Sequence, residues 1–76
     1  MKISITLTGM LASSMGYKRK VIEVSDKTTI RKLLELLVLP IKTEWLAVSV
    51  NGVLKDKKKQ LNDGDDVFIM PAGGAG

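Results

Sequence analysis

One amphipathic segment limits the folds that this 76-residue chain can adopt. Between Thr29 and Pro40 the apolar residues recur at helical spacing and form one stripe: Ile30, Leu33, Leu34, Leu37 and Val38. Thr28 or Thr29 is the predicted N-cap, and Pro40 is expected to end the helix because its ring cannot follow helical backbone. A single helix with one apolar stripe needs one sheet with one matching face, which predicts two packed layers.

The remaining apolar residues alternate, and they predict strands on both sides of the helix. Segments 2–8 and 18–25 are expected to pair as a hairpin, with a short helical turn between them that Gly16 ends. Segments 45–50, 53–54 and 67–70 follow the helix, joined by turns at 51–52 and 62–65. This order predicts an α+β, ubiquitin-like β-grasp: a mixed sheet of four to five strands packed on one helix.

The absence of Cys and His narrows the possible chemistry. It excludes Cys or Ser nucleophiles paired with His, and it excludes the usual zinc sites. Asp63, Asp65 and Asp66 lack the spacing of a calcium loop, and turn formation explains them, so no metal site is expected. No apolar run approaches the ~20 residues that span a bilayer, and the N-terminus has a strand pattern. We therefore expect a cytoplasmic protein without a membrane partner.

The net charge of +4 raises the question of a nucleic-acid partner. The basic run 55–59 has no interleaved aromatic residue, and the whole chain has one Trp, one Tyr and one Phe. Single-strand binders need such rings for base stacking, so nucleic acid is an unfavoured partner. A solvated loop is the favoured interpretation of this run. Electrostatic attraction to an acidic partner or an anionic substrate is the alternative.

The C-terminal segment is nearly devoid of side chains. Residues 71–76 read Pro-Ala-Gly-Gly-Ala-Gly, and glycine has the most backbone freedom to lose on folding. We expect a β-grasp domain over residues 1–70 and a flexible glycine-rich tail over residues 71–76. Within the last strand, Phe68 and Met70 point opposite to Val67 and Ile69. They are expected on the open face of the sheet.

Several motifs together resemble the MoaD/ThiS family of sulfur carriers. The specific ones are Val48-Ser49-Val50-Asn51-Gly52, then Leu61-Asn62-Asp63-Gly64-Asp65-Asp66-Val67, then a Pro and a glycine-rich end. The segment 7–11 and Gly16 agree more loosely with the short helical turn of the molybdopterin-type members. The family comprises the small subunit of molybdopterin synthase and the carrier of the thiamine pathway. The resemblance covers nearly the whole chain.

The resemblance implies a carrier with no catalytic residue and no bound cofactor of its own. Gly76 would be adenylated by a ubiquitin-activating-type enzyme, which uses the ATP, and then converted to a thiocarboxylate. Gly73, Gly74 and Ala75 would thread into that enzyme. Family members usually end on Gly-Gly, so either Gly76 is used directly, which we favour, or Ala75-Gly76 is trimmed to expose Gly74.

The expected partners follow from the same resemblance. Phe68, Met70 and Trp45 are the predicted partner-binding patch, although they could simply cover a strand edge. The large subunit of molybdopterin synthase is a possible second partner, since the molybdopterin (molybdenum or tungsten cofactor) pathway is weakly favoured over thiamine. A ubiquitin-like modifier conjugated to lysines, and an interaction or RNA-binding module with an idle tail, are the alternatives.

Overall fold

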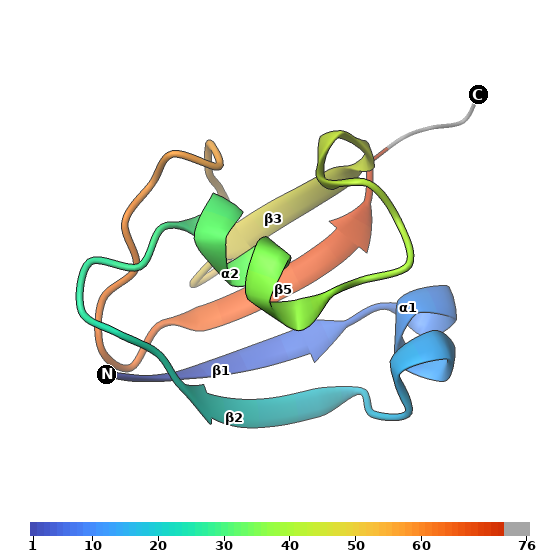
Figure 1. Cartoon of the computed structure of the whole chain (residues 1–76), viewed down its shortest axis with the longest axis horizontal. Helices are drawn as coiled ribbons and strands as arrows, with labels where there is room; N and C mark the ends of the chain where they lie inside the picture. Colours follow the sequence, from blue (N-terminus) through green and yellow to red (C-terminus); the bar gives the residue numbers. More distant parts are fainter. Residues whose placement is uncertain (73–76) are drawn as a thin grey trace.

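The computed structural model describes residues 1–72. Its elements, in chain order, are β1 (Lys2–Leu7), α1 (Gly9–Met15), β2 (Arg19–Glu23), α2 (Ile30–Leu37), the 3-10 helix η1 (Thr43–Trp45), β3 (Leu46–Val50), β4 (Val53–Leu54) and β5 (Asp66–Pro71). Five strands form one mixed sheet in the order β2-β1-β5-β3-β4. Strands β1 and β5 are parallel, and the other neighbours are antiparallel. Helix α2 lies across one face (Figure 1), which confirms the predicted β-grasp.

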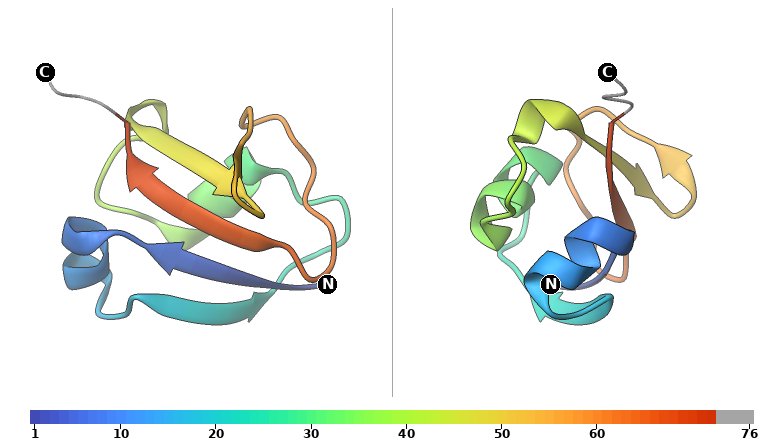
Figure 2. Two further views of the ribbon diagram at one scale, coloured as in Figure 1. Left: turned by 180° about the vertical axis from the view of Figure 1, so that it is seen from behind. Right: turned by 90° about the vertical axis from the view of Figure 1, so that its right-hand side faces the viewer.

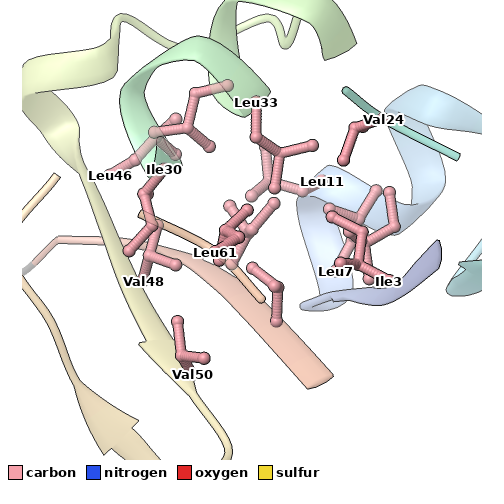
Figure 3. Packing of buried hydrophobic residues seen from close by; sticks show 14 residues of the cluster. Ile3, Leu7, Leu11, Val24, Ile30, Leu33, Leu46, Val48, Val50 and Leu61 are labelled. Atoms are coloured by element: carbon pink, nitrogen blue, oxygen red, sulfur yellow. The ribbon is translucent and has the colours of Figure 1, made fainter. Parts of the chain in front are cut away.

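The core lies between α2 and the inner face of the sheet. Alternate residues of β1, β3 and β5 point into it, and helix α2 contributes Ile30, Leu33 and Leu34. Figure 3 shows these side chains converging from the helix and the strands. The cluster consists of 14 buried residues: Ile3, Ile5, Leu7, Leu11, Val24, Ile30, Leu33, Leu34, Leu46, Val48, Val50, Leu61, Val67 and Ile69. Its apolar area supplies most of the driving force for folding.

Helix α2 begins as expected and ends earlier than expected. The Thr29 side chain accepts a hydrogen bond from the Lys32 N–H at 3.1 Å, which confirms Thr29 as the N-cap. The helix ends at Leu37, because Val38 adopts the left-handed conformation with φ 51°. Val38 is 79% exposed, so its predicted place on the core stripe is wrong. The predicted stop at Pro40 is also displaced, since Val38 has already broken the helix.

The start of the third strand also differs from its prediction. Trp45 is the last residue of η1, and its N–H donates to the Lys42 carbonyl at 2.9 Å. This tight turn replaces the extended backbone that the sequence predicted at residue 45. Strand β3 therefore begins at Leu46, which is buried against the core.

The loop between β1 and β2 contains a complete short helix, α1. Leu11 is fully buried and attaches this helix to the core, while Gly16 ends it with φ 82°. The predicted helical turn before Gly16 is thus confirmed. Helix α1 packs at one end of the sheet, and α2 covers the inner face (Figure 2). Within residues 1–72 no helix covers the opposite face, which we call the outer face.

Candidate partner-binding face and chain exit

Strand β5 occupies the middle of the sheet and is the last strand before the C-terminal segment. Its neighbours are β1 on one side and β3 on the other, so backbone pairing holds it along both edges. Pro71 still pairs with Leu46, and the Ala72 N–H donates to the Trp45 carbonyl at 2.6 Å. The chain is thus held by β3 and η1 up to Ala72. The predicted tail residues Gly73, Gly74, Ala75 and Gly76 lie outside the described residues.

The outer face carries the predicted apolar residues of β5. Phe68 is 38% exposed and Met70 is half-buried, whereas the alternate residues Val67 and Ile69 are fully buried. The expected orientation of these four side chains is therefore confirmed. Trp45 is 55% exposed and precedes β3 at the end of the sheet where β5 finishes.

Phe68 and Met70 share the outer face of β5, and Trp45 lies beside the chain exit because its carbonyl accepts from the Ala72 N–H. Met70 lies opposite Ala47 in the antiparallel register, and Phe68 lies between Thr6 of β1 and Ser49 of β3. These neighbours are small or short, so Phe68 stands above its surroundings. Exposed apolar side chains on a sheet face that no helix covers are typical of a docking surface. Its role in binding stays a prediction.

A polar cluster adjoins Phe68, and the sequence did not reveal it. Arg19 Nη1 donates to the Thr6 hydroxyl at 3.1 Å and lies 3.6 Å from Asp66 Oδ1. The Ser4 hydroxyl donates to the same Asp66 oxygen at 3.1 Å. The cluster joins β2, β1 and β5, so only the register of the sheet places its members together. Outward-facing polar residues in two predicted strands, and Asp66 directly before a third, were the available signal. Strand order was the missing information.

The residues that carry the family resemblance hold β5 in place. Asp65 is buried, and its two carboxylate oxygens accept from the Asn51 side-chain amide at 3.0 Å and the Asn62 N–H at 2.8 Å. Asn51 in turn accepts from the Asp66 N–H at 2.9 Å through its side-chain oxygen. The hairpin turn after β3 and the turn before β5 are thereby joined. These residues are structural supports for the strand that leads to the C-terminus.

A second set of contacts joins the same turn to β1. Asp63 Oδ1 accepts from the Lys2 N–H, and the Gly64 N–H donates to the Lys2 carbonyl, both at 2.7 Å. Gly64 has φ 85°, a conformation that side chains with a Cβ adopt only with strain. The turn chemistry predicted for residues 62–65 is confirmed. The carboxylates of Asp63 and Asp65 accept hydrogen bonds within this arrangement.

Two negative observations apply to the part of the chain that the structure describes. Residues 1–72 contain no group of three or more His, Cys, Asp or Glu side chains arranged to hold a metal ion. None of the helices found there has the length and apolar character needed to cross a bilayer.

A family model decides the relationship of this chain to known proteins. The model of the ThiS family matches residues 5–76, which include nearly the whole domain and the C-terminal glycines. The chain belongs to the ThiS family. This confirms the resemblance drawn from the Asn51-Gly52 turn and the aspartate-rich turn. A search of curated proteins finds no match to this ThiS-family chain.

Solved structures agree on the fold. Small archaeal modifier protein 1 from Haloferax volcanii is 19% identical with a TM-score of 0.81, and the alignment covers 100% of both chains. A candidate molybdopterin converting factor subunit 1 from Pyrococcus furiosus is 20% identical with a TM-score of 0.80, covering 95% of this chain and 98% of that one. Subunits 1 and 2 of the molybdopterin-converting factor of Helicobacter pylori form a complex, in which the similar chain is 23% identical with a TM-score of 0.60 and a coverage of 93% of each chain.

The family match and these ubiquitin-like structures together support a sulfur carrier or a ubiquitin-like modifier. Small proteins of this kind are generally not enzymes.

Proposed function

We propose that this ThiS-family chain is a sulfur carrier whose C-terminal glycine receives sulfur in molybdopterin biosynthesis. The observation that carries the proposal is the placement of β5. It is paired with β1 and β3, the chain is held at Ala72, and Gly-Gly-Ala-Gly follows immediately in the sequence. Residues 71–76 would then be the presented segment, and residues 1–70 the scaffold. Residues 71 and 72 are its fixed root.

The proposed chemistry takes place on the terminal carboxylate in two steps. This group is ionised at neutral pH, because its ordinary pKa is about 3.5. One carboxylate oxygen attacks the α-phosphorus of ATP, and pyrophosphate leaves, giving an acyl-adenylate. A sulfur nucleophile then attacks the carbonyl carbon, and AMP leaves. When the nucleophile is hydrosulfide, the product is the thiocarboxylate itself; when it is a persulfide, a second thiol cleaves the acyl disulfide, forming a disulfide with the donor sulfur and leaving the thiocarboxylate. The adenylating partner binds the ATP and supplies the catalytic groups, so the carrier needs no cofactor of its own.

Two partners follow from this proposal. The first is the adenylating enzyme, which we expect to contact Phe68, Met70 and Trp45 while it receives the tail. The second is a large subunit like that of molybdopterin synthase, which would take up the sulfur. The complex of subunits 1 and 2 in Helicobacter pylori supports a partner of this second kind. Glycine and alanine at positions 73–76 suit a narrow channel, because they add no bulk beyond a methyl group.

Mass spectrometry tests the proposal directly. The full-length chain is incubated with its adenylating enzyme, ATP and a sulfur donor, and its intact mass is measured. One exchange of oxygen for sulfur on the full chain is expected if Gly76 is used. Loss of Ala75-Gly76 before the exchange would show that Gly74 is the working terminus. No exchange on either form would contradict the proposal.

A pull-down distinguishes the molybdopterin pathway from the thiamine pathway. The wild-type chain and a variant lacking residues 73–76 are used as baits, and the captured proteins are identified. A large pterin-synthase subunit bound by the wild type alone supports the molybdopterin assignment. Capture of enzymes of thiazole formation instead would assign the chain to thiamine.

A ubiquitin-like modifier is the second candidate, favoured by the similarity to small archaeal modifier protein 1 over the full length. It requires the same adenylation, but an amine of a target lysine replaces sulfur as the nucleophile. Peptides with glycine-derived remnants on lysines would support it. A thiocarboxylate without such conjugates would favour the carrier.

A further inference from the structure

A basic surface hollow lies beside the outer face, between the start of α2, strand β3 and the loop after β4. Its volume is about 530 Å³. The residues that define this basic hollow are Arg31, Lys55, Lys57 and Lys58 around Ala47 and Leu54. Figure 1 shows the loop after β4 running beside the start of α2. Two backbone hydrogen bonds fix this arrangement: the Ile30 N–H to the Lys59 carbonyl at 3.0 Å, and the Arg31 N–H to the Lys57 carbonyl at 2.9 Å.

Within residues 1–72, no ion pair involves the arginine or the lysines of the hollow. The ion pairs there join the Met1 ammonium with Asp26, and Arg19 with Asp66, both away from the hollow. Asp56 is the single carboxylate in the lining, and its Oδ1 accepts from the Lys58 N–H at 2.8 Å. Four cations against one carboxylate give the hollow most of the net charge of the chain. Such a field attracts an anionic partner.

The backbone geometry does not suit a small phosphate ligand. A phosphate site needs convergent N–H donors, as at a free helix N-terminus or a glycine-rich loop. Here the first amides of α2 donate to Lys59, Lys57 and Thr29. The loop amides of Lys55 and Lys59 also donate internally, to the carbonyls of Val48 and Asp56. Flexible lysine and arginine side chains without convergent backbone donors suit an extended anionic surface.

The lining also distinguishes between two extended anions, an acidic protein segment and a nucleic acid. No aromatic ring lines the hollow, so bases would find nothing to stack on. Its lining instead includes four apolar residues, Leu46, Ala47, Val48 and Leu54, of which Leu54 is 67% exposed. Carboxylate side chains interspersed with apolar ones match this combination.

Two residues of the hollow neighbour the predicted partner-binding patch in the register of the sheet. Ala47 lines it and pairs with Met70, while Leu54 pairs with Ser49, which lies opposite Phe68. We propose that the basic hollow binds an acidic segment of the adenylating partner, next to the apolar contact that Phe68 and Met70 make. The name of this partner rests on the proposed function. The acidic character of the bound segment rests on the hollow alone.

A peptide probe tests the hollow without the partner enzyme. A deca-glutamate peptide is titrated into the isotope-labelled full chain at low salt, and amide shifts are followed by NMR. We expect the largest shifts at Arg31, Lys55, Lys57 and Lys58, equally in a variant lacking residues 73–76. The double variant Lys55→Glu with Lys58→Glu should weaken binding about tenfold, as expected for loss of a local field. Lys18→Glu with Lys27→Glu, an equal change at exposed lysines outside the hollow, should weaken it less than twofold.

Three results would overturn the proposal. Equal weakening by both double variants would mean that only net charge matters. Tighter binding of a ten-nucleotide oligouridine would indicate nucleic acid, and tighter binding of pyrophosphate would indicate a phosphate site.

A kinetic experiment with the adenylating enzyme extends this test. The double variant Lys55→Glu with Lys58→Glu should raise the KM for the carrier about tenfold with kcat unchanged. If the peptide binds at the hollow but the chain is not adenylated, the binding site is supported and the proposed function is contradicted.

Discussion

The side-chain amide of Asn51 and the carboxylate of Asp65 lie 3.0 Å apart and join two turns that are 14 residues apart in the sequence. One turn follows β3 and the other precedes β5. The contact sets the position at which β5 enters the middle of the sheet, and therefore the position at which the chain leaves it. One set of supports for the chain exit thus lies at the opposite end of β5.

Asn51→Gly tests this contact. Glycine accommodates the φ of 53° at this position, so the change reports the loss of the side-chain hydrogen bonds to Asp65 and from the Asp66 N–H. We expect the free energy of unfolding in urea to fall by about 1–3 kcal/mol, because Asp65 is left with an unpaired buried oxygen. Asn62→Ala is the control: only its backbone is seen to bond Asp65, so its effect should be within about 0.5 kcal/mol.

Gly64→Ala tests the conformation of the turn before β5. An added Cβ would meet nothing within 4 Å, so the cost comes from the φ of 85° alone. We expect a loss of about 1–2 kcal/mol in unfolding free energy. Gly9→Ala provides a matched comparison, since this site is equally open, lies at the start of α1 and lacks a positive φ. That variant should be neutral or more stable by up to about 1 kcal/mol. Equal losses in both would contradict this interpretation.

Val38→Gly should stabilise the protein. A β-branched residue with φ 51° is strained, and Val38 is 79% exposed, so little packing is lost when its side chain is removed. Glycine is the residue most often found at such a helix end. We expect a rise in the free energy of unfolding of up to about 1 kcal/mol, measured by thermal or urea denaturation. A decrease would mean that the valine side chain makes contacts that its exposure does not indicate.

Phe68→Asp should separate docking from folding. Phe68 projects from the outer face, whereas its neighbours in the sequence point into the core. The substitution therefore leaves the core residues unchanged. We expect adenylation to fall at least about tenfold, as for truncation of an interface anchor, while the domain remains folded. Leu36→Asp is the control, because Leu36 is 55% exposed and belongs to α2, which covers the inner face. Full activity of Phe68→Asp would remove the outer face from the proposed interface.

Gly74→Val tests the proposed threading of residues 73–76. A branched side chain should obstruct a channel that accepts glycine and alanine, so adenylation is expected to be lost. Gly74→Ala is the control, since alanine already occurs at position 75. It should retain most activity. Unfolding free energies of both variants should match the wild type within about 0.5 kcal/mol. Loss of activity in both would point to an interaction specific to glycine.

Periodicity predicted the layers of this fold well, because β1, β3, β5 and the helix α2 each carry one buried apolar face. The N-cap at Thr29 and the turn at Asn51-Gly52 followed from local backbone chemistry. The end of α2 did not, because Val38 adopts a backbone conformation that valine disfavours. The tight turn at Trp45 was likewise hidden within an apolar run that is typical of a strand.

The candidate site likewise has features that local sequence patterns predict and features that they do not predict. The opposite orientation of Phe68 and Val67 followed from strand alternation alone. The cluster of Arg19, Ser4 and Asp66 did not, since it requires β1 to lie between β2 and β5. The basic hollow needed tertiary structure as well, because it unites Arg31 of α2 with the loop after β4. Contacts between distant segments depend on strand order, which local patterns do not encode.

The parallel pairing of β1 with β5 has a consequence for biosynthesis. The central strand of the sheet is the last part of the domain to leave the ribosome, so a nascent chain has β1 and β3 without the strand that joins them. The sheet can close only after Pro71 has emerged. A chain interrupted before that point would not form the scaffold. Completion of the fold therefore depends on synthesis of the segment that precedes the glycines.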